Sequence, residues 1–270
     1  MSKAVLTEYE LRASGLTLPL KVALVADLHE RPADDILKLL QSAKPDLLAI
    51  AGDTLERCGE NGSDASQTPY PLGKRIILSA AHSVNHALRL VFARNNHPDK
   101  ENAYRFLRGA SELCPVFMSL GNHENVLTGE DYRILASLGV HLLDNADYSL
   151  DIGGQMIRAG GLSSRYDRRW LERFSRKDGY KILLCHHPEY YDTLLDGANF
   201  DLVLAGHNHG GQVRLFGKGL MSSTTGPLPK YDKGVFDGRM VVSAGCSNTT
   251  AIPRFNNPRE AVIIRLTPTG

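Results

Sequence analysis

The sequence predicts an α/β fold, and three observations support this class. Short apolar runs bounded by turn residues are typical of buried strands, and they occur at residues 21–26, 46–51, 115–120, 181–185 and 202–205. Between some of these runs, apolar residues recur at helical spacing. Each of the five runs is also followed by a polar side chain that can bind a metal, as at the carboxyl ends of strands in an α/β sheet. If the strands lie in register, these ends converge on one site.

Length and composition limit the classes of function. A chain of 270 residues with 42% hydrophobic content can bury one sizeable core, and we expect a single domain over residues 1–270. The formal net charge of +1 gives no general attraction to nucleic acid or to an anionic membrane. No apolar run approaches ~18 residues, so we expect no membrane anchor. Four scattered cysteines without a CxxC pair favour buried free thiols in a reducing, cytoplasmic compartment.

The first central strand, residues 21–26, ends at Asp27, and His29 follows two residues later. In an extended segment, residues two apart point to the same side, so Asp27 and His29 form a candidate ligand pair. Residues 4–9 precede it as an expected edge strand. After it, Pro32 opens an expected amphipathic helix. The pair is weak evidence by itself.

The second central strand, residues 46–51, stops at Asp53. A buried carboxylate needs a cation or a hydrogen-bond network, although an aspartate here can also simply cap the next turn. Residues 57–73 are rich in Gly, Ser, Asn, Pro and Thr and predict a loop, and residues 76–92 predict a long helix. His82 and His86 lie four apart on that helix, where we interpret them as solvated or core-edge histidines.

The remaining three strands end in histidine-rich segments. Residues 115–120 run into Asn122 and His123, where asparagine is a competent oxygen ligand and histidine can act as an acid or base. Residues 181–185 end at His186 and His187, and chemistry alone does not decide which of the two is a ligand. Residues 202–205 lead to His207 and His209, which are again two apart, with glycines at 206, 210 and 211 that allow the close approach of an ion or phosphate.

Taken in order, these blocks resemble the signature of the calcineurin-like metallophosphoesterases. The matching blocks are Asp27-Leu28-His29, Gly52-Asp53, Gly121-Asn122-His123-Glu124, His186, and the GHNHGGQ segment at 206–212. They span residues 21–212. The final Gly-Gly-Gln resembles a branch of bacterial phosphoesterases that includes enzymes acting on lipid or cell-envelope phosphodiesters.

The resemblance implies a four-layer α-β-β-α sandwich, with two mixed sheets flanked by helices and an insertion around residues 57–112. It implies two divalent transition-metal ions, and mixed carboxylate and imidazole ligands suit Mn, Fe or Zn. Carried over residue by residue, the first ion would be bound by Asp27, His29 and His209, the second by Asn122, His186 and His207, and both by the bridging Asp53. His123 would be the catalytic residue.

The implied activity is hydrolysis of a small phosphoester, preferably a phosphodiester, through a hydroxide that bridges the two metals. A phosphomonoesterase, a nucleotide phosphatase and a non-catalytic interaction scaffold are the alternatives. Arg165 or Arg168 can bind a substrate phosphate, although a basic solvated face on a helix packed through Tyr166, Trp170 and Phe174 is the simpler interpretation. His187 would line the pocket. The insertion would act as a lid or as a homo-oligomer interface.

Overall fold

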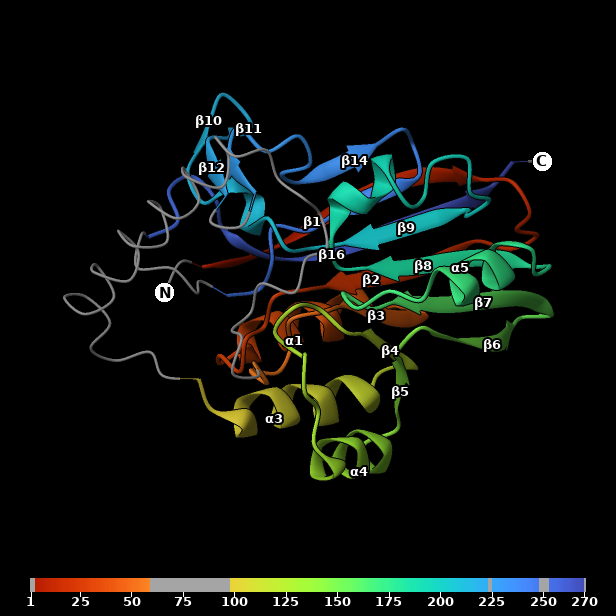
Figure 1. Ribbon diagram of the computed structural model, residues 1–270, viewed down its shortest axis with the longest axis horizontal. Helices are drawn as coiled ribbons and strands as arrows, with labels where there is room; N and C mark the ends of the chain where they lie inside the picture. The colour runs from red at the N-terminus through yellow and green to blue at the C-terminus, as the bar shows by residue number, and fades with distance from the viewer. Residues whose placement is uncertain (1–2, 59–97, 223–224, 248–252, 270) are drawn as a thin grey trace.

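Two six-stranded mixed sheets pack face to face in the computed structural model, which describes residues 3–58, 98–222, 225–247 and 253–269 (Figure 1). The predicted helix at 76–92, with His82 and His86, lies outside the described residues, as does most of the predicted insertion. The lid, the oligomer interface and the single-domain organisation therefore stay predictions.

The first sheet contains both ends of the chain and the first three strands that were expected to carry ligands. Its strand order is β1-β16-β2-β3-β4-β5, with bounds Ala4–Ala13, Arg259–Pro268, Leu20–Val25, Leu47–Ala51, Val116–Ser119 and Val140–Leu143. Strands β2, β3, β4 and β5 are parallel, whereas β16 runs antiparallel to β2 and parallel to β1. The parallel register puts the residues after β2, β3 and β4 at one edge of the sheet.

The second sheet carries the last two ligand strands. Its order is β14-β15-β9-β8-β7-β6, with bounds Gly234–Phe236, Met240–Val242, Leu202–Ala205, Tyr180–Cys185, Gln155–Leu162 and Ala146–Ile152. The four central strands are parallel, and β14 and β6 are antiparallel edge strands. Short pairs β10–β11 (Arg214–Leu215 and Lys218–Gly219) and β12–β13 (Met221–Ser222 and Gly226–Pro227) follow β9.

Helices cover the outer face of each sheet and complete the four layers that the sequence predicts. Helices α1 (Asp34–Ala43), α3 (Lys100–Ser111) and α4 (Gly129–Ser137) lie on the first sheet. Helix α5 (Arg168–Ser175) and the 3₁₀ turn η1 (Pro188–Asp192) lie on the second. Among the described helices, none is long and apolar enough to cross a membrane.

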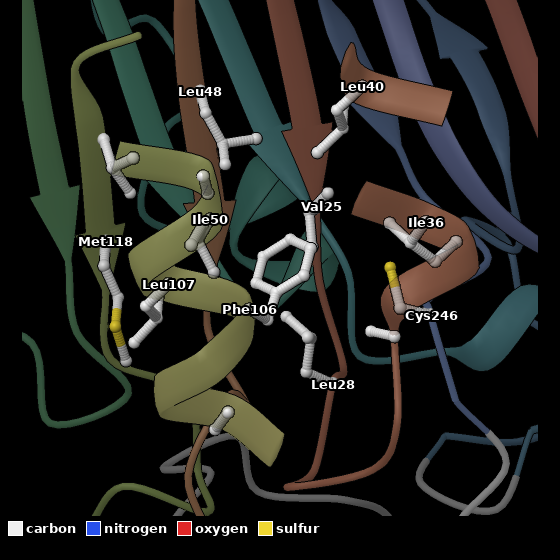
Figure 2. Packing of buried hydrophobic residues seen from close by; sticks show 14 of the residues in the cluster. Val25, Leu28, Ile36, Leu40, Leu48, Ile50, Phe106, Leu107, Met118 and Cys246 are labelled. Atoms are coloured by element: carbon white, nitrogen blue, oxygen red, sulfur yellow. The ribbon is translucent and has the colours of Figure 1, made fainter. Parts of the chain in front are cut away.

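Three apolar clusters fill the spaces between the layers. Figure 2 shows the outer cluster of the first sheet, where Ile36 and Phe106 pack on Leu48 and Ile50. On the same strand, Leu47, Ala49 and Ala51 face the other way and pack between the two sheets. Side chains alternate along a strand, so a strand buried on both faces has an unbroken apolar run. This burial explains why the ligand strands are recognisable as short apolar segments.

Two local predictions are confirmed with small differences. The first helix begins at Asp34 rather than at Pro32, with Asp34 and Asp35 in its first turn. On α5, Trp170 and Phe174 are buried and stack with ring centroids 5.2 Å apart, and Tyr166 packs against the same cluster. Cys185 and Cys246 are buried free thiols, but Cys58 is exposed because it lies in a loop at the edge of the described chain.

Candidate metal centre

The ends of five strands from both sheets meet at one site. Asp27, Asp53 and Asn122 follow β2, β3 and β4 of the first sheet, and His186 and His207 follow β8 and β9 of the second. All five side chains are buried. The structure thus brings together ligand candidates that lie up to 180 residues apart in the chain, since the backbone N–H of His207 lies 3.3 Å from both carboxylate oxygens of Asp27.

One group of candidate ligands consists of Asp27, His29 and His209. Oδ1 of Asp27 lies 3.9 Å from Nε2 of His29 and 3.9 Å from Nε2 of His209. The two imidazole rings stack with centroids 5.4 Å apart. Nε2 of His29 is buried, and no hydrogen bond to it is found among the described residues. A buried donor or acceptor left in this way is costly, so this group fits a cation.

A second, tighter group surrounds Nε2 of His186. This nitrogen lies 3.1 Å from Oδ2 of Asp53, 3.1 Å from Oδ1 of Asn122 and 3.1 Å from Nδ1 of His207. Donor atoms held about 2.1 Å from one ion at right angles are separated by about 3 Å. His186 Nδ1 donates to the Ala51 carbonyl at 2.7 Å, which leaves Nε2 to face the group. The observed spacing therefore fits a shared cation.

Asp53 lies between the two groups. Its Oδ2 is 3.7 Å from Nε2 of His29 and 3.1 Å from Nε2 of His186. Burial opposes its ionisation, but His186, His123 and His29 lower the pKa of Asp53 well below its usual value. Burial instead raises the pKa of Asp27. A carboxylate placed between two sets of imidazoles is the position that a bridging ligand needs.

The backbone around the site is unusually constrained. Five of the candidate ligands have positive φ: Asp27 (57°), His29 (51°), Asp53 (55°), His207 (73°) and His209 (46°). Such conformations cost about 1–3 kcal/mol each for residues other than glycine and cluster at functional sites. Gly121 is required for space, since a Cβ there would lie 2.0 Å from Oδ1 of Asp53. The chain adopts strained turns so that these side chains point inward.

Glu56 is a site residue that the sequence reasoning missed. Its carboxylate lies 2.8 Å from Nδ1 of His29 and 2.8 Å from Nδ1 of His123. A carboxylate only accepts hydrogen bonds, so both ring nitrogens must carry protons and both Nε2 atoms turn toward Asp53. Burial opposes the charged form of His123, but Asp53, Cys58 and Glu56 raise its pKa to about 12. An acidic residue three positions after Asp53 was the available signal.

Glu124 holds the two strand-end loops of the first sheet together. Oε2 accepts the backbone N–H groups of Gly121 at 2.8 Å and Asp53 at 2.9 Å. Oε1 accepts those of Thr54 and, at 2.8 Å, Leu55. The sequence reasoning placed Glu124 in a motif without giving it a role. Its position shows that it fixes the backbone on which Asp53 and Asn122 sit.

The three candidate substrate residues lie in different surroundings. His187 is buried behind the second group, with its ring centroid 4.3 Å from that of His207 and its Nε2 2.8 Å from Oγ of Ser164. Arg165 is exposed and lines a 230 Å³ cavity that also touches Gly121 and Glu124. Arg168 is exposed at the start of α5 and does not line this cavity. Of the two arginines, Arg165 is therefore the better placed.

Comparisons with known proteins agree with this geometry. The chain is similar to the Uncharacterized protein YpbG of Bacillus subtilis (strain 168), with 24% identity over 254 residues that cover 92% of this chain and 81% of that protein. It is also similar to the Uncharacterized metallophosphoesterase Cj0846 of Campylobacter jejuni, with 25% identity over 265 residues, 93% of this chain and 60% of that protein. The chain thus spans less than two thirds of the Campylobacter relative.

One solved structure with a similar arrangement is that of a hypothetical protein from Thermus thermophilus. It shares 18% identity, has a TM-score of 0.44, and covers 84% of this chain and 76% of its own. The model of the calcineurin-like phosphoesterase family matches residues 20–211, which include every candidate ligand. On this match over most of its length, the chain belongs to the calcineurin-like phosphoesterase family, whose members are metal-dependent.

Proposed function

We propose that the protein is a dinuclear-metal phosphoester hydrolase that acts on phosphodiesters. The observation that carries this proposal is the place of Asp53, whose Oδ2 lies within 3.7 Å of Nε2 on both His29 and His186. One carboxylate oxygen is thus shared by two separate groups of ligands. Two ions held ~3.5–4 Å apart need such a shared ligand.

In this proposal each group of side chains binds one ion. Asp27, His29 and His209 bind the first, Asn122, His186 and His207 bind the second, and Asp53 bridges them. When bound, the two ions would polarise the phosphoryl group and activate a water molecule for in-line attack. The mixture of imidazole, amide and carboxylate donors favours Mn, Fe or Zn.

His123 would supply the proton that the leaving oxygen needs. Its Nδ1–H is bound to Glu56, and its Nε2 lies 3.8 Å from Oδ2 of Asp53, so Nε2 faces the reaction centre. The raised pKa of His123, about 12, favours a ring with protons on both nitrogens. A proton held at Nε2 can pass to the ester oxygen as the P–O bond breaks. Glu56 keeps the ring in this orientation.

Substrate contacts and surroundings are a further part of the proposal. The bacterial branch resembled by the GHNHGGQ segment favours a phosphodiester over a monoester or nucleotide. Arg165, at the cavity beside the Asn122 loop, would bind a substrate phosphate, with Arg168 farther away and His187 behind the second ion. The free thiols of Cys185 and Cys246 support a reducing, cytoplasmic compartment.

Activity measured with defined metals tests this function. The metal-free protein is loaded separately with Mn, Fe or Zn and assayed with bis(nitrophenyl) phosphate, nitrophenyl phosphate, nucleotides and cyclic nucleotides. We expect two metal equivalents per chain and faster turnover of the diester. Faster turnover of a monoester or nucleotide would change the substrate class. Protein that binds no metal and hydrolyses none of these substrates would be an interaction scaffold.

A further inference from the structure

Glu189, in η1, lies behind the second group of ligands. Oε1 of Glu189 lies 3.4 Å from Nδ1 of His187 and 3.9 Å from Nε2 of His207. Both carboxylate oxygens and Nδ1 of His187 are buried, and no hydrogen bond to these three atoms is found in the described part of the chain. A carboxylate without hydrogen bonds is costly to bury, so this one should have partners in the working protein.

The proton positions on the neighbouring histidines identify those partners. Nδ1 of His207 faces the second group, 3.1 Å from Nε2 of His186. An imidazole nitrogen that binds a metal carries no proton, so the single proton of a ligating His207 sits on Nε2. That nitrogen is the one that points to Glu189. The site therefore directs an N–H group at the Glu189 carboxylate.

His187 completes the same arrangement. Its Nε2 lies 2.8 Å from Oγ of Ser164, whose hydroxyl can donate to it. The proton of a neutral His187 is then on Nδ1, which also points to Glu189, at 3.4 Å. One carboxylate thus faces two imidazole N–H groups, and only one of these imidazoles belongs to the candidate ligand set.

We propose that Glu189 is a positioning residue for the second ion. It accepts the Nε2–H of His207 and the Nδ1–H of His187, which holds His207 in the tautomer and orientation that present Nδ1 to the metal. This inference rests on the proposed function, since it assumes that His207 binds an ion. It also gives His187 a role, which is to hold the carboxylate from the side opposite Ser164.

The effect of Glu189 should be confined to one ion. The carboxylate contacts histidines of the second group only, whereas His29 of the first group is bound by Glu56 at 2.8 Å. Carboxylates behind metal-binding histidines typically change metal affinity by ~10–100-fold. Loss of Glu189 should therefore weaken the second ion by that factor and leave the first ion in place.

The variant Glu189→Gln tests this, because it keeps the shape and removes one acceptor oxygen. Wild type, Glu189→Gln and the exposed control Glu172→Gln on α5 are loaded with Zn²⁺, titrated with a chelator and analysed for metal content. We expect Glu189→Gln to lose one equivalent at a ~10–100-fold lower chelator concentration and the control to match wild type. In ¹⁵N spectra of the Zn²⁺-loaded protein, the His207 Nε2–H signal should shift in Glu189→Gln alone.

Unchanged affinity for both ions in Glu189→Gln would overturn the inference and leave the proposed function intact. A third equivalent in wild type that Glu189→Gln lacks would also overturn it, because Glu189 would then bind an ion of its own with His187 and His207. Wild type that binds no ion would reject the proposed function itself. If Glu189→Gln does not fold, Glu189→Asp replaces it: the charge remains but the reach is shorter, so the second ion should still be weakened.

Discussion

The two halves of the metal centre differ in how firmly a carboxylate holds their histidines. In the first half, Glu56 lies 2.8 Å from Nδ1 of both His29 and His123. In the second half, Glu189 lies 3.4 Å from His187 and 3.9 Å from His207. The first set of distances describes formed hydrogen bonds, and the second set describes groups that face each other without one. The protein's own contacts thus organise the first half more completely.

The backbone shows the same contrast. Glu124 accepts four N–H groups from the two loops that carry Asp53 and Asn122, so these loops move as one unit. In the second sheet, the His207–His209 turn is held through the side chain of Asn208, which donates to the Tyr231 carbonyl at 2.8 Å. We expect the second half to tighten when its ion binds, so metal-loaded protein should show a shorter Glu189–His207 distance.

Replacing the shared residue should disable both halves at once. Asp53→Asn keeps the size of the side chain but removes the charge that both groups share. We expect a loss of turnover of about 10³-fold or more, beyond the ~10–100-fold typical of residues behind a ligand. Metal content should fall below two equivalents while the circular dichroism spectrum stays the same. A variant with both ions and normal turnover would show that Asp53 is not the bridge.

His123 should affect chemistry without affecting metal content. We expect His123→Ala to keep both ions and to lower kcat by ~10²–10⁴-fold, as for a general acid. The loss should shrink for nitrophenyl esters, because a leaving oxygen of low pKa needs little protonation. Measuring kcat for nitrophenyl and alkyl diesters checks this. Equal losses for both would indicate that His123 stabilises charge instead of donating a proton.

Glu56→Gln provides the counterpart of Glu189→Gln and tests the comparison directly. Glu56 contacts one candidate ligand of the first ion and the catalytic His123, so its loss should weaken the first ion by ~10–100-fold and also lower kcat. Chelator titration of the two variants should remove different ions first. Spectra of Co²⁺-substituted protein can tell the two ions apart. If both variants lose the same ion, the division into two halves is wrong.

The sequence was sufficient to predict the ligand strands and the four layers. Leu48 and Ile50 face the helices and Leu47 and Ala49 face the other sheet, and burial on both faces makes an apolar run that is easy to recognise. The same burial hides which sheet a strand joins, because such a run has no polar face. The sequence therefore predicted that the strand ends meet, but not that they come from two sheets.

The carboxylates behind the ligands could not be predicted in the same way. Glu56 and Glu189 lie in segments after the strands, where no periodicity fixes the direction of a side chain. Their roles depend on contacts with His123, which is 67 residues away from Glu56, and with His207. Choosing between Arg165 and Arg168 also needed the fold, since both are exposed and only Arg165 lines the cavity.

The smallest expected effect lies outside both halves and concerns these two arginines. Arg165 is exposed, so a hydrogen bond from it to a substrate phosphate is screened by solvent and contributes about 1 kcal/mol. Arg165→Ala should raise KM by ~5-fold with little change in kcat, whereas Arg168→Ala should behave as wild type. Metal content should stay at two equivalents in both variants. Assays at low and high salt check the charge effect, because the Arg165→Ala difference should decrease as salt screens the contact. A larger loss in Arg168→Ala would mean that the substrate crosses α5 and does not enter the cavity beside the Asn122 loop.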